Sequence, residues 1–479
     1  MQYWKPPADE EFAGDMMPFW DGRRFHLFYL LDRRHHAEQG GLGGHQWAHA
    51  STANLTDWEH YPLAVPIGEP GEVDQHGICT GSIFEHEGVC HAFYATRIKR
   101  PDGSVFEAVC RADSPDLIRF DKSPDNPLFA APPGLDPRNH RDPFVFRHPE
   151  TGAFHMLVTA SRLPGDAPGD GPERGVLAHY TSNDLQQWRY EGPCLTLDKD
   201  PCPECPEHFF WNGWWYLVYS QGAQLQYWLS RDPLGPWQRA RRLAIEGPSL
   251  AVPRTAGWTG GRRLAVGFLP WRQGGRDDGG YVYAGSAVFR ELLQEDDGTL
   301  ATRFVPEMMP QTGLPLPWRL QDRAANAVRE ADGAITLSAG DLSAGEGTAT
   351  ALIPDAPADA VLTFQVIPTA GVAEYGLLLR TDERGETGYR LRFLPHENQV
   401  VLEAWPARAG GPKATAAGIK RLDQAAAIVV CLKGSIIDIC INERHTLVER
   451  CFDHRGTHLG LFVQAGQAKF EDLRLSPLL

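Results

Sequence analysis

Three acidic residues of the chain stand at nearly the same distance before three similar segments. Asp15, Asp142 and Glu204 lie 10, 12 and 11 residues before short runs rich in aromatic and branched residues. Acidic residues are common in turns, but each of these three stands beside proline, cysteine or aromatic residues. Glycosidic bonds are cleaved by pairs of carboxyl groups, one giving a proton and the other attacking carbon or activating water. If the fold brings the three acids together, their types suit that chemistry.

The sequence around the acids suggests how their roles divide. Crowded carboxylates raise the pKa of one member and keep it protonated near neutral pH. Glu204 stands in the segment CPECP, a rigid and weakly polar stretch, so burial is expected to raise its pKa and make it the acid. Arg141 directly precedes Asp142 and is expected to keep that residue ionised.

The runs behind the acids belong to a repeat that organises the first 300 residues. Its copies start 65, 64, 61 and 48 residues apart and are FHLFYL (25–30), CHAFYA (90–95), FHMLVT (154–159), WYLVYS (215–220) and RLAVGF (263–268). A period of this size with several short strands is typical of one propeller blade. Five copies predict an all-β, five-bladed β-propeller whose inner strands bring equivalent residues to a central pocket. A β-sandwich with chance similarity is the alternative.

The pattern of residue types in the sequence changes after the last repeat. We predict a catalytic propeller over residues 1–308, a proline-rich linker over 309–333 and an accessory β-sandwich over 334–479. The last region has about eight strand patterns: VLTFQVI, YGLLLRT, YRLRFL, VVLEAW, AIVVCL, IIDICI, LGLFVQ and FEDLRL. Such a series predicts a sandwich.

Aromatic side chains near the inferred channel are candidate sugar platforms, since sugar rings stack on them. Trp20, Trp47, Trp211 and Trp271 fall near the channel, although each also suits a hydrophobic core. His49 stands close to Trp47 and equally suits a structural role. In the second repeat the place of the acids is taken by Thr80-Gly81-Ser82, with Asp74 and His76 just upstream. Asp74 is included as a candidate substrate contact.

These residues resemble the motifs of glycoside hydrolase family 32, the β-fructofuranosidases, inulinases and levanases. The family's R-D-P motif is present at 141–143 and its E-C-P motif at 204–206. Its W-M-N-D-P-N-G motif ahead of a YHLFYQ strand is matched loosely by GDMMP at 14–18 ahead of FHLFYL. WAHA at 47–50 followed by DWEH at 57–60, and TGS at 80–82, are similar to its W-G-H-A, H-W-E-H and F-S-G-S motifs.

The resemblance implies a role for each matched residue. Asp15 would be the nucleophile, Asp142 the transition-state stabiliser and Glu204 the acid/base. Trp47, Ser82 and Arg141 would contact the sugar in the −1 subsite. It also implies a propeller followed by a sandwich, and hydrolysis of furanosidic, fructosyl bonds with retention through a covalent glycosyl-enzyme intermediate.

The first motif departs from the family pattern in ways that affect sugar recognition. The asparagine before the nucleophile is Gly14 here, and the glutamine that ends the following strand is Leu30. A site that loses such polar groups binds a fructose ring with fewer hydrogen bonds. The departures point to another furanoside, or to fructose in an unusual linkage.

Two other functions stay open on sequence grounds. The first is an inverting enzyme resembling the family 43 arabinofuranosidases and xylosidases, in which the first aspartate is a general base. A carboxyl separation of about 5–5.5 Å would indicate retention and one of about 6.5–9.5 Å inversion. The second is a non-catalytic carbohydrate-binding propeller.

Composition restricts the partners. The formal net charge of −15 argues against a nucleic-acid partner, and no run of about 20 apolar residues predicts a membrane span. Nine cysteines without disulfide-like spacing favour the cytoplasm. Cys202 and Cys205 could be half of a zinc site, but a second C-x-x-C is absent. We expect a small sugar or oligosaccharide substrate and no metal or organic cofactor, and the sequence leaves a homo-oligomer open.

Overall fold

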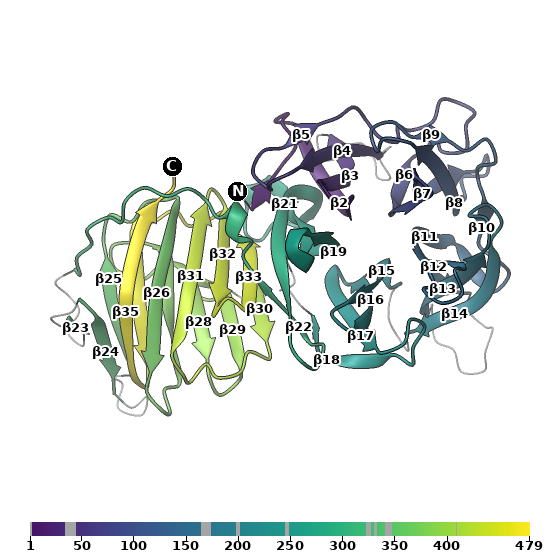
Figure 1. Ribbon diagram of the computed structural model, residues 1–479. Helices are drawn as coiled ribbons and strands as arrows, with labels where there is room; N and C mark the ends of the chain where they lie inside the picture. Colours follow the sequence, from purple (N-terminus) through teal and green to yellow (C-terminus); the bar gives the residue numbers. More distant parts are fainter. Residues whose placement is uncertain are drawn as a thin grey trace.

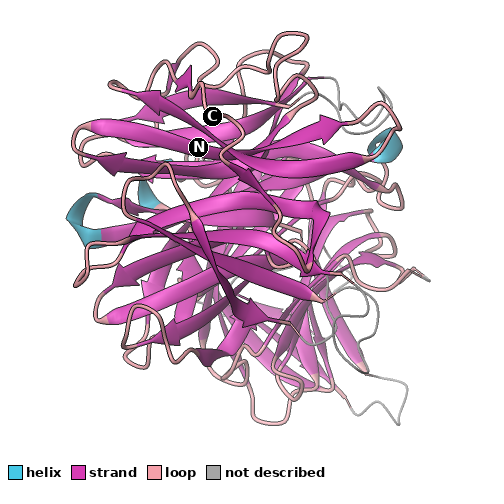
Figure 2. Cartoon of the chain, turned by 90° about the vertical axis from the view of Figure 1, so that its right-hand side faces the viewer, coloured by secondary structure: helices cyan, strands magenta, loops and turns pink. Residues whose placement is uncertain are grey.

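The chain is built almost entirely of antiparallel strands. The computed structural model describes residues 2–33, 45–163, 174–197, 202–244, 249–321, 327–329, 333–340, 347–408 and 410–479. Within these ranges there is no α-helix, only the short 3-10 helices η2 (Thr259–Gly261), η3 (Gln273–Gly275) and η4 (Pro306–Met308) (Figure 2). No helix in this part of the chain has the length and apolarity needed to cross a bilayer.

The first part of the chain forms four sheets that surround a common centre, as the blades of a propeller do (Figure 1). The largest joins both ends of this part and has the order β19-β20-β21-β2-β3-β4-β5, with β1 and β22 paired to β21. Its strands are β1 (Tyr3–Trp4), β2 (Glu11–Trp20), β3 (Phe25–Arg33), β4 (Gln46–Thr52), β5 (Glu59–His60), β19 (Ala251–Trp258), β20 (Arg262–Arg272), β21 (Tyr281–Gln294) and β22 (Leu300–Arg303).

The other three sheets follow in chain order. The second holds β6 (Ile78–His86), β7 (Val89–Lys99), β8 (Val105–Ser114), β9 (Asp121–Lys122) and β10 (Phe129–Ala130). The third holds β11 (Leu135–Arg147), β12 (Phe154–Arg162), β13 (Gly175–Ser182) and β14 (Arg189–Thr196). The fourth holds β15 (Glu204–Trp211), β16 (Trp214–Gln221), β17 (Gln224–Ser230) and β18 (Gln238–Ala244).

The five copies of the sequence repeat are confirmed as strands with one common place in these sheets. They are β3, β7, β12, β16 and β20, and each pairs antiparallel with the strand before it, which lies nearest the centre. Their residues are buried almost throughout, because neighbouring sheets cover both faces of each strand. This explains why the repeat reads as near-continuous apolar sequence.

The second part of the chain forms two facing sheets. One has the order β23-β24-β35-β26-β31-β32-β33, and the other β25-β34-β27-β28-β29-β30. The strands are β23 (Ala327–Arg329), β24 (Ile335–Ala339), β25 (Thr348–Ile353), β26 (Ala360–Pro368), β27 (Glu374–Thr381), β28 (Gly388–Leu394), β29 (Gln399–Trp405), β30 (Ala414–Ala417), β31 (Ala426–Lys433), β32 (Ile436–Ile441), β33 (His445–Arg450), β34 (His458–Gln464) and β35 (Gly466–Pro477).

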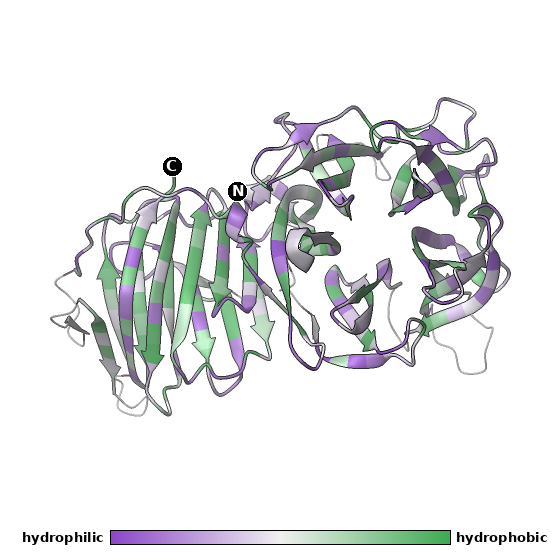
Figure 3. Cartoon of the chain, viewed as in Figure 1, coloured by the Kyte–Doolittle hydropathy of each residue, from purple (hydrophilic) through white to green (hydrophobic). Residues whose placement is uncertain are grey.

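The two sheets share one apolar core, to which both contribute inward side chains. Hydrophobic and hydrophilic residues alternate along many of their strands (Figure 3), as expected where one face is buried. All eight predicted segments are strands, namely β26, β27, β28, β29, β31, β32, β34 and β35. The short strands β24, β25, β30 and β33 were not predicted.

The proline-rich segment expected as a linker lies along the sandwich. The backbone N–H groups of Gly313 and Leu316 donate to carbonyls of β35, and the Trp318 indole donates to the Leu473 carbonyl at 3.1 Å. Within the expected range 309–333, β23 pairs with β24. The segment is therefore bound to the sandwich by backbone hydrogen bonds, which its sequence pattern does not predict.

A buried ion pair joins the two parts of the chain. Nη2 of Arg290, on β21, donates to Oδ1 of Asp438, on β32, at 2.6 Å, and both side chains have no exposed area. Gln2 and Tyr3 also donate to the Asp438 carboxylate, each at 3.0 Å. Charges removed from water in this way need all of these partners.

Candidate active site

Each of the five strands nearest the centre contains the same irregularity. Each of these strands has one more residue than its partner strand over the same stretch. Such an extra residue is a β-bulge. The shifts fall between Ala13 and Met16 on β2, Ile78 and Gly81 on β6, Arg141 and Phe144 on β11, Glu204 and Glu207 on β15, and Ala251 and Arg254 on β19. A bulge re-aims side chains, and these five turn residues toward one central cavity.

The three predicted acids occupy successive positions of this common bulge. Glu204 is the residue just before the bulge, Asp142 is its first residue and Asp15 its second. The second bulge position is proline at 143, 206 and 253, which suits a place where the ladder is broken, because proline has no N–H to pair.

The bulges surround a cavity of about 700 Å³. All three acids line it, together with Arg141, so the structure brings together four of the residues predicted from the sequence. The rest of its wall is formed by Leu30, His45, Cys79, Thr80, Arg97, Val105, Glu107, Arg138, Asn139, Cys205, Ala223, Ala251, Val252, Phe268 and Tyr283. A cavity with this mixture of charged groups and apolar walls suits a small, hydroxyl-rich ligand.

Asp15 has a raised pKa and two hydrogen-bond partners. Its Oδ2 accepts a hydrogen bond from the Thr80 hydroxyl at 2.9 Å, and its backbone N–H donates to the Tyr283 hydroxyl at 3.0 Å. Burial raises the pKa of Asp15 to about 7, and the neighbouring charges of Asp142 and Glu204 add to the rise. Below neutral pH the crowded site therefore carries a proton on this carboxyl.

Asp142 is held rigidly. Its side chain is almost fully buried, and its backbone has a φ of 55°, in the left-handed region. Its Oδ2 accepts hydrogen bonds from the Thr159 hydroxyl and from the N–H of Cys205, both at 3.1 Å. A non-glycine residue persists in this conformation only where its surroundings fix it, and here the two hydrogen bonds and the bulge do so.

Glu204 is paired with Arg141. Nη2 of Arg141 donates to Oε1 of Glu204 at 2.7 Å, whereas its Nε lies 3.8 Å from the Asp142 carboxylate. The side chain of Glu204 is 39% exposed. The expectation that Glu204 is sealed from water is therefore wrong, whereas the expected contact of Arg141 with Asp142 is present.

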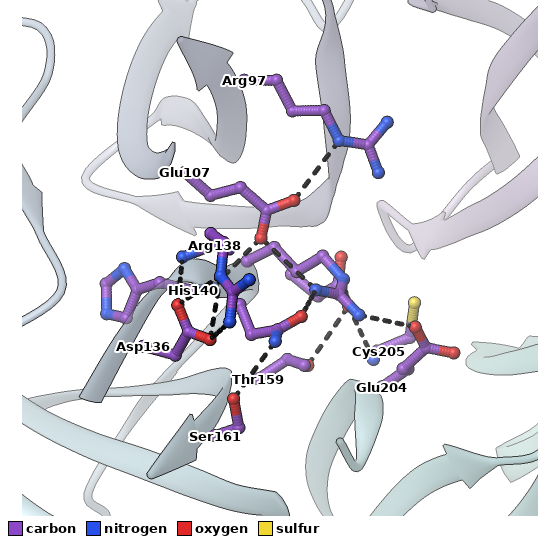
Figure 4. A network of polar contacts seen from close by, with 12 residues as sticks. Arg97, Glu107, Asp136, Arg138, His140, Thr159, Ser161, Glu204 and Cys205 are labelled. Carbon is purple, nitrogen blue, oxygen red and sulfur yellow. Dashed lines mark hydrogen bonds and ion pairs between the residues drawn. The ribbon is translucent and has the colours of Figure 1, made fainter. Parts of the chain in front are cut away.

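A polar network behind Arg141 contains residues that the sequence did not single out. The buried Glu107 accepts from Nη1 of Arg141 and from Nε of Arg97, both at 3.3 Å (Figure 4). Nη1 of Arg141 also donates to Oδ1 of Asn139 at 3.0 Å. Glu107 and Arg97 stand on β8 and β7, outside the repeat positions that were compared, and no spacing rule pointed to them.

Two further missed residues, Thr80 and Tyr283, contact Asp15. Thr80 belongs to the Thr80-Gly81-Ser82 segment, which takes the place of the acids in the second repeat. The family resemblance pointed to Ser82 of this segment as the sugar contact, and not to Thr80. The register of the bulge decides between them. Thr80 lines the cavity, whereas the Ser82 hydroxyl donates to the Pro143 carbonyl at 2.9 Å and so ties β6 to β11.

Trp47, His49 and Asp74 lie in the protein interior and not in the cavity wall. The fully buried Trp47 donates from Nε1 to the Cys79 carbonyl at 2.9 Å. His49 stacks on Phe28, with ring centroids 4.2 Å apart, and burial lowers its pKa to about 2. Asp74, with 1% exposure, is 2.8 Å from the Lys122 ammonium. All three are structural in this arrangement.

Trp20 and Trp271 also lie away from the cavity. Trp20 packs edge-to-face on Trp258, with ring centroids 4.8 Å apart, in a separate hollow that also includes Trp211. Trp271 packs on Phe452 of the sandwich at 5.0 Å. Trp20 ends β2, five residues beyond Asp15, and Trp271 is on β20, which lies outside the inner strand β19.

Comparisons with known proteins identify the relatives of this chain. Residues 16–231 match the model of the glycosyl hydrolases family 32 N-terminal domain, a range that begins directly after Asp15. Sucrose-6-phosphate hydrolase of Escherichia coli is 25% identical over 309 residues, covering 60% of this chain and 61% of that protein. Sucrose-6-phosphate hydrolase of Klebsiella pneumoniae is 28% identical over 331 residues, covering 62% and 64%. The match thus spans just over three fifths of these relatives' length.

Solved structures share the fold over the whole chain. A family 32 β-fructofuranosidase of Bombyx mori superposes with a TM-score of 0.68 at 17% identity, covering 100% of this chain and 93% of that one. An exo-inulinase of Aspergillus awamori has a TM-score of 0.69 at 15% identity, covering 100% and 97%. At such identities the likeness concerns the fold alone.

Proposed function

We infer that the chain belongs to glycoside hydrolase family 32, and from this premise we propose that it hydrolyses furanosidic bonds of fructosides with retention of configuration. The observation that carries the proposal is the meeting of Asp15, Asp142 and Glu204 in one cavity. Retaining glycosidases need a nucleophilic carboxylate and a proton-donating carboxyl on either side of the scissile bond. The names of its relatives and structural neighbours, which include sucrose-6-phosphate hydrolase, β-fructofuranosidase and exo-inulinase, suggest the substrates to test first.

The mechanism assigns one bond change to each acid. The ionised Asp15 attacks the anomeric carbon while Glu204 gives its proton to the leaving oxygen, which departs as an alcohol. The sugar is then an ester of Asp15. The Glu204 carboxylate takes a proton from water, the hydroxide oxygen bonds to the anomeric carbon, and Asp15 leaves as carboxylate. The proton that Glu204 gave in the first step is thereby restored.

Asp142 would stabilise the positive charge that develops on the sugar ring between these steps. Its hydrogen bonds from Thr159 and Cys205 fix the carboxylate before substrate arrives. A preorganised negative group lowers the barrier because no reorganisation is needed when charge appears. Asp142 needs no movement for this role.

In the ligand-free site the nucleophile Asp15 holds a proton that it must lose before it can attack the sugar. Asp15 carries it below about pH 7, whereas the mechanism requires it on Glu204. In a coupled cluster the number of protons matters more than their resting place. Substrate binding would displace Arg141 from Glu204 toward the sugar, which leaves Glu204 able to hold the proton and Asp15 ionised.

Product analysis tests the proposal. The panel would contain sucrose, sucrose 6-phosphate, inulin, levan, difructose anhydrides and nitrophenyl furanosides, each with wild type and Glu204→Gln. Release of a retained anomer, seen by NMR at early times, supports it. An inverted anomer would favour the inverting, family 43-like mechanism, and binding without sugar release would favour a non-catalytic carbohydrate-binding protein.

We also propose how the fold is divided. The nine-stranded sheet counts as two blades, because β2 and β21 share only the pair Ala13–Gly285. With the other three sheets this makes five blades, in agreement with the five equivalent bulges. The catalytic propeller would then occupy residues 1–308 and the accessory sandwich 334–479, with 309–333 between them.

The setting of the protein follows from its charge and cysteines. All nine cysteines are free thiols, which supports a reducing cytoplasm. The net charge of −15 supports a sugar and not a nucleic acid as partner. Separating a cell lysate into cytoplasmic and exported fractions, with detection by antibody, would test the location.

A further inference from the structure

Position 14 differs from its four equivalents around the cavity. The first bulge residue is Cys79, Asp142, Cys205 or Val252 on the other inner strands, and all four of these side chains line the cavity. On β2 it is Gly14, which has no side chain to contribute. The φ of Gly14 is not in the left-handed region, so its backbone conformation does not explain the glycine.

The space beside Gly14 is filled by a residue from another strand. A Cβ on Gly14 would lie 2.3 Å from the hydroxyl oxygen of Tyr283 and 2.6 Å from two of its ring carbons. Tyr283, on β21, lines the cavity, and its ring lies between His45 and Phe268, with centroids 5.0 and 5.2 Å away. The Tyr283 side chain therefore fits in this place only because residue 14 is a glycine.

The Tyr283 hydroxyl contacts Asp15 in two ways. It accepts the backbone N–H of Asp15 at 3.0 Å, and a hydrogen bond from it to the Asp15 side chain acts against the rise in the Asp15 pKa. Burial and the nearby Asp15 carboxylate raise the pKa of Tyr283 well above its usual value, so the phenol keeps its proton. One oxygen thus fixes the backbone of Asp15 and stabilises its charge.

We propose that Tyr283 is the positioning residue of the nucleophile Asp15, and that the Gly14–Tyr283 pair replaces the side chain that β2 does not supply. The inference rests on the proposed function, since it concerns the same reaction. The Thr80 hydroxyl donates to the Asp15 carboxylate, and the Tyr283 hydroxyl holds the Asp15 backbone. Tyr283 acts through Asp15 and forms no bond to the sugar.

The main test is Tyr283→Phe, with Tyr281→Phe as matched control. Tyr281 is on the same strand but 58% exposed, and its hydroxyl accepts from Arg272. Loss of a hydrogen bond to the charged form should raise the Asp15 pKa by about one unit. The limb of the kcat/KM profile that reports the proton of Asp15 would move up by that amount in Y283F and stay in place in Y281F.

A titration that needs no turnover separates this inference from the proposed function. In protein labelled with [13Cγ]aspartate, Asp15 is the signal lost in Asp15→Asn, and its midpoint is measured by NMR in wild type and Y283F. An unchanged midpoint in Y283F overturns the inference even if the enzyme is active. Absence of sugar release by wild type with a shifted midpoint overturns the proposed function alone.

Steric coupling gives a second measurement. Gly14→Ala should lower the Tm of wild type, because the methyl group collides with Tyr283, and should lower it much less in a Tyr283→Ala background. Equal losses of Tm in both backgrounds would show that the two residues are independent and overturn the pairing. Four proteins and one thermal unfolding curve each complete this cycle.

Discussion

Nη2 of Arg141 lies 2.7 Å from Oε1 of Glu204, and the same guanidinium also contacts Glu107 and Asn139. One planar group therefore connects the acid/base candidate to the buried network behind it. A lysine ammonium is a point charge on a flexible stem and does not reproduce this geometry. The relationship makes the arrangement of the site depend on the shape of Arg141 as well as on its charge.

Arg141→Lys should lower kcat/KM by about two orders of magnitude, which is the cost of misplacing a catalytic group by about 1 Å. Initial rates on the best substrate of the panel measure this. Arg138→Lys is the control, because Arg138 also lines the cavity but pairs with Asp136. Equal losses in the two variants would contradict a special role for Arg141.

Glu204→Gln should slow substrates unequally. A glutamine gives no proton to the leaving oxygen, so sucrose should lose on the order of 10²–10⁴-fold in kcat. A nitrophenyl furanoside, whose leaving group departs as a stable anion, needs little help and should lose far less. A similar loss on both substrates would argue that Glu204 is not the proton donor.

The pH profile should report Asp15. The mechanism uses its carboxylate, and the pKa of Asp15 is raised to about 7 by burial and by Asp142 and Glu204. Because Glu204 must be protonated at the same time, log kcat/KM should be bell-shaped, and it should fall above about pH 7, where the site loses the proton that the mechanism uses. A profile without a decline above about pH 7 would contradict this environment.

The same pKa has a consequence for stability. The folded pKa of Asp15 lies above its unfolded value of 3.8, so the folded chain binds more protons between these two values and stability falls as pH rises from about 4 to 7. Asp15→Asn removes this penalty and should raise the Tm by a few degrees at pH 8 but not at pH 4. Asp74→Asn is the control, because it breaks the buried pair with Lys122 and should lower the Tm at pH 8. A lower Tm for D15N at pH 8 would count against the prediction.

Stability should also depend on the ion pair between propeller and sandwich. Asp438→Ala leaves Arg290 buried without its carboxylate, and breaking one side of such a pair costs about 3–5 kcal/mol. Urea unfolding with separate probes for the two parts would measure this. A loss below about 1 kcal/mol would mean that water enters and solvates Arg290. The exposed pair of Arg444 and Glu295, which also joins the two parts, is the control and should cost under about 1 kcal/mol on Glu295→Ala.

The sequence was most informative where one pattern recurred. Five similar apolar runs identified five strands in equivalent places, and distances measured from them identified Asp15, Asp142 and Glu204. It was least informative for residues placed by tertiary packing. Tyr283 reaches Asp15 from 268 residues away, and no local pattern predicts that contact.

Aromatic residues illustrate the same limit. Trp20 and Trp271 were expected near the inferred channel, but Trp20 lines a separate hollow and Trp271 packs on Phe452 of the sandwich. Trp47 fills the interior beside the cavity and binds the carbonyl of Cys79 instead of a sugar. A residue can be close to a site residue along a strand and still lie far from the cavity. Which residues face the cavity depends on the register of the bulges.

All five inner strands contain the same bulge, and the residues in it are not those that form the regular hydrogen bonds of the sheets. Residues in a bulge take no part in the regular hydrogen-bond ladder, so a side chain there can be exchanged without breaking the ladder, although packing against Tyr283 still restricts Gly14. Val252 and Cys79 occupy two such positions without an evident chemical task. They are the natural places at which directed evolution could alter the choice of sugar, with the nucleophile and proton donor left untouched.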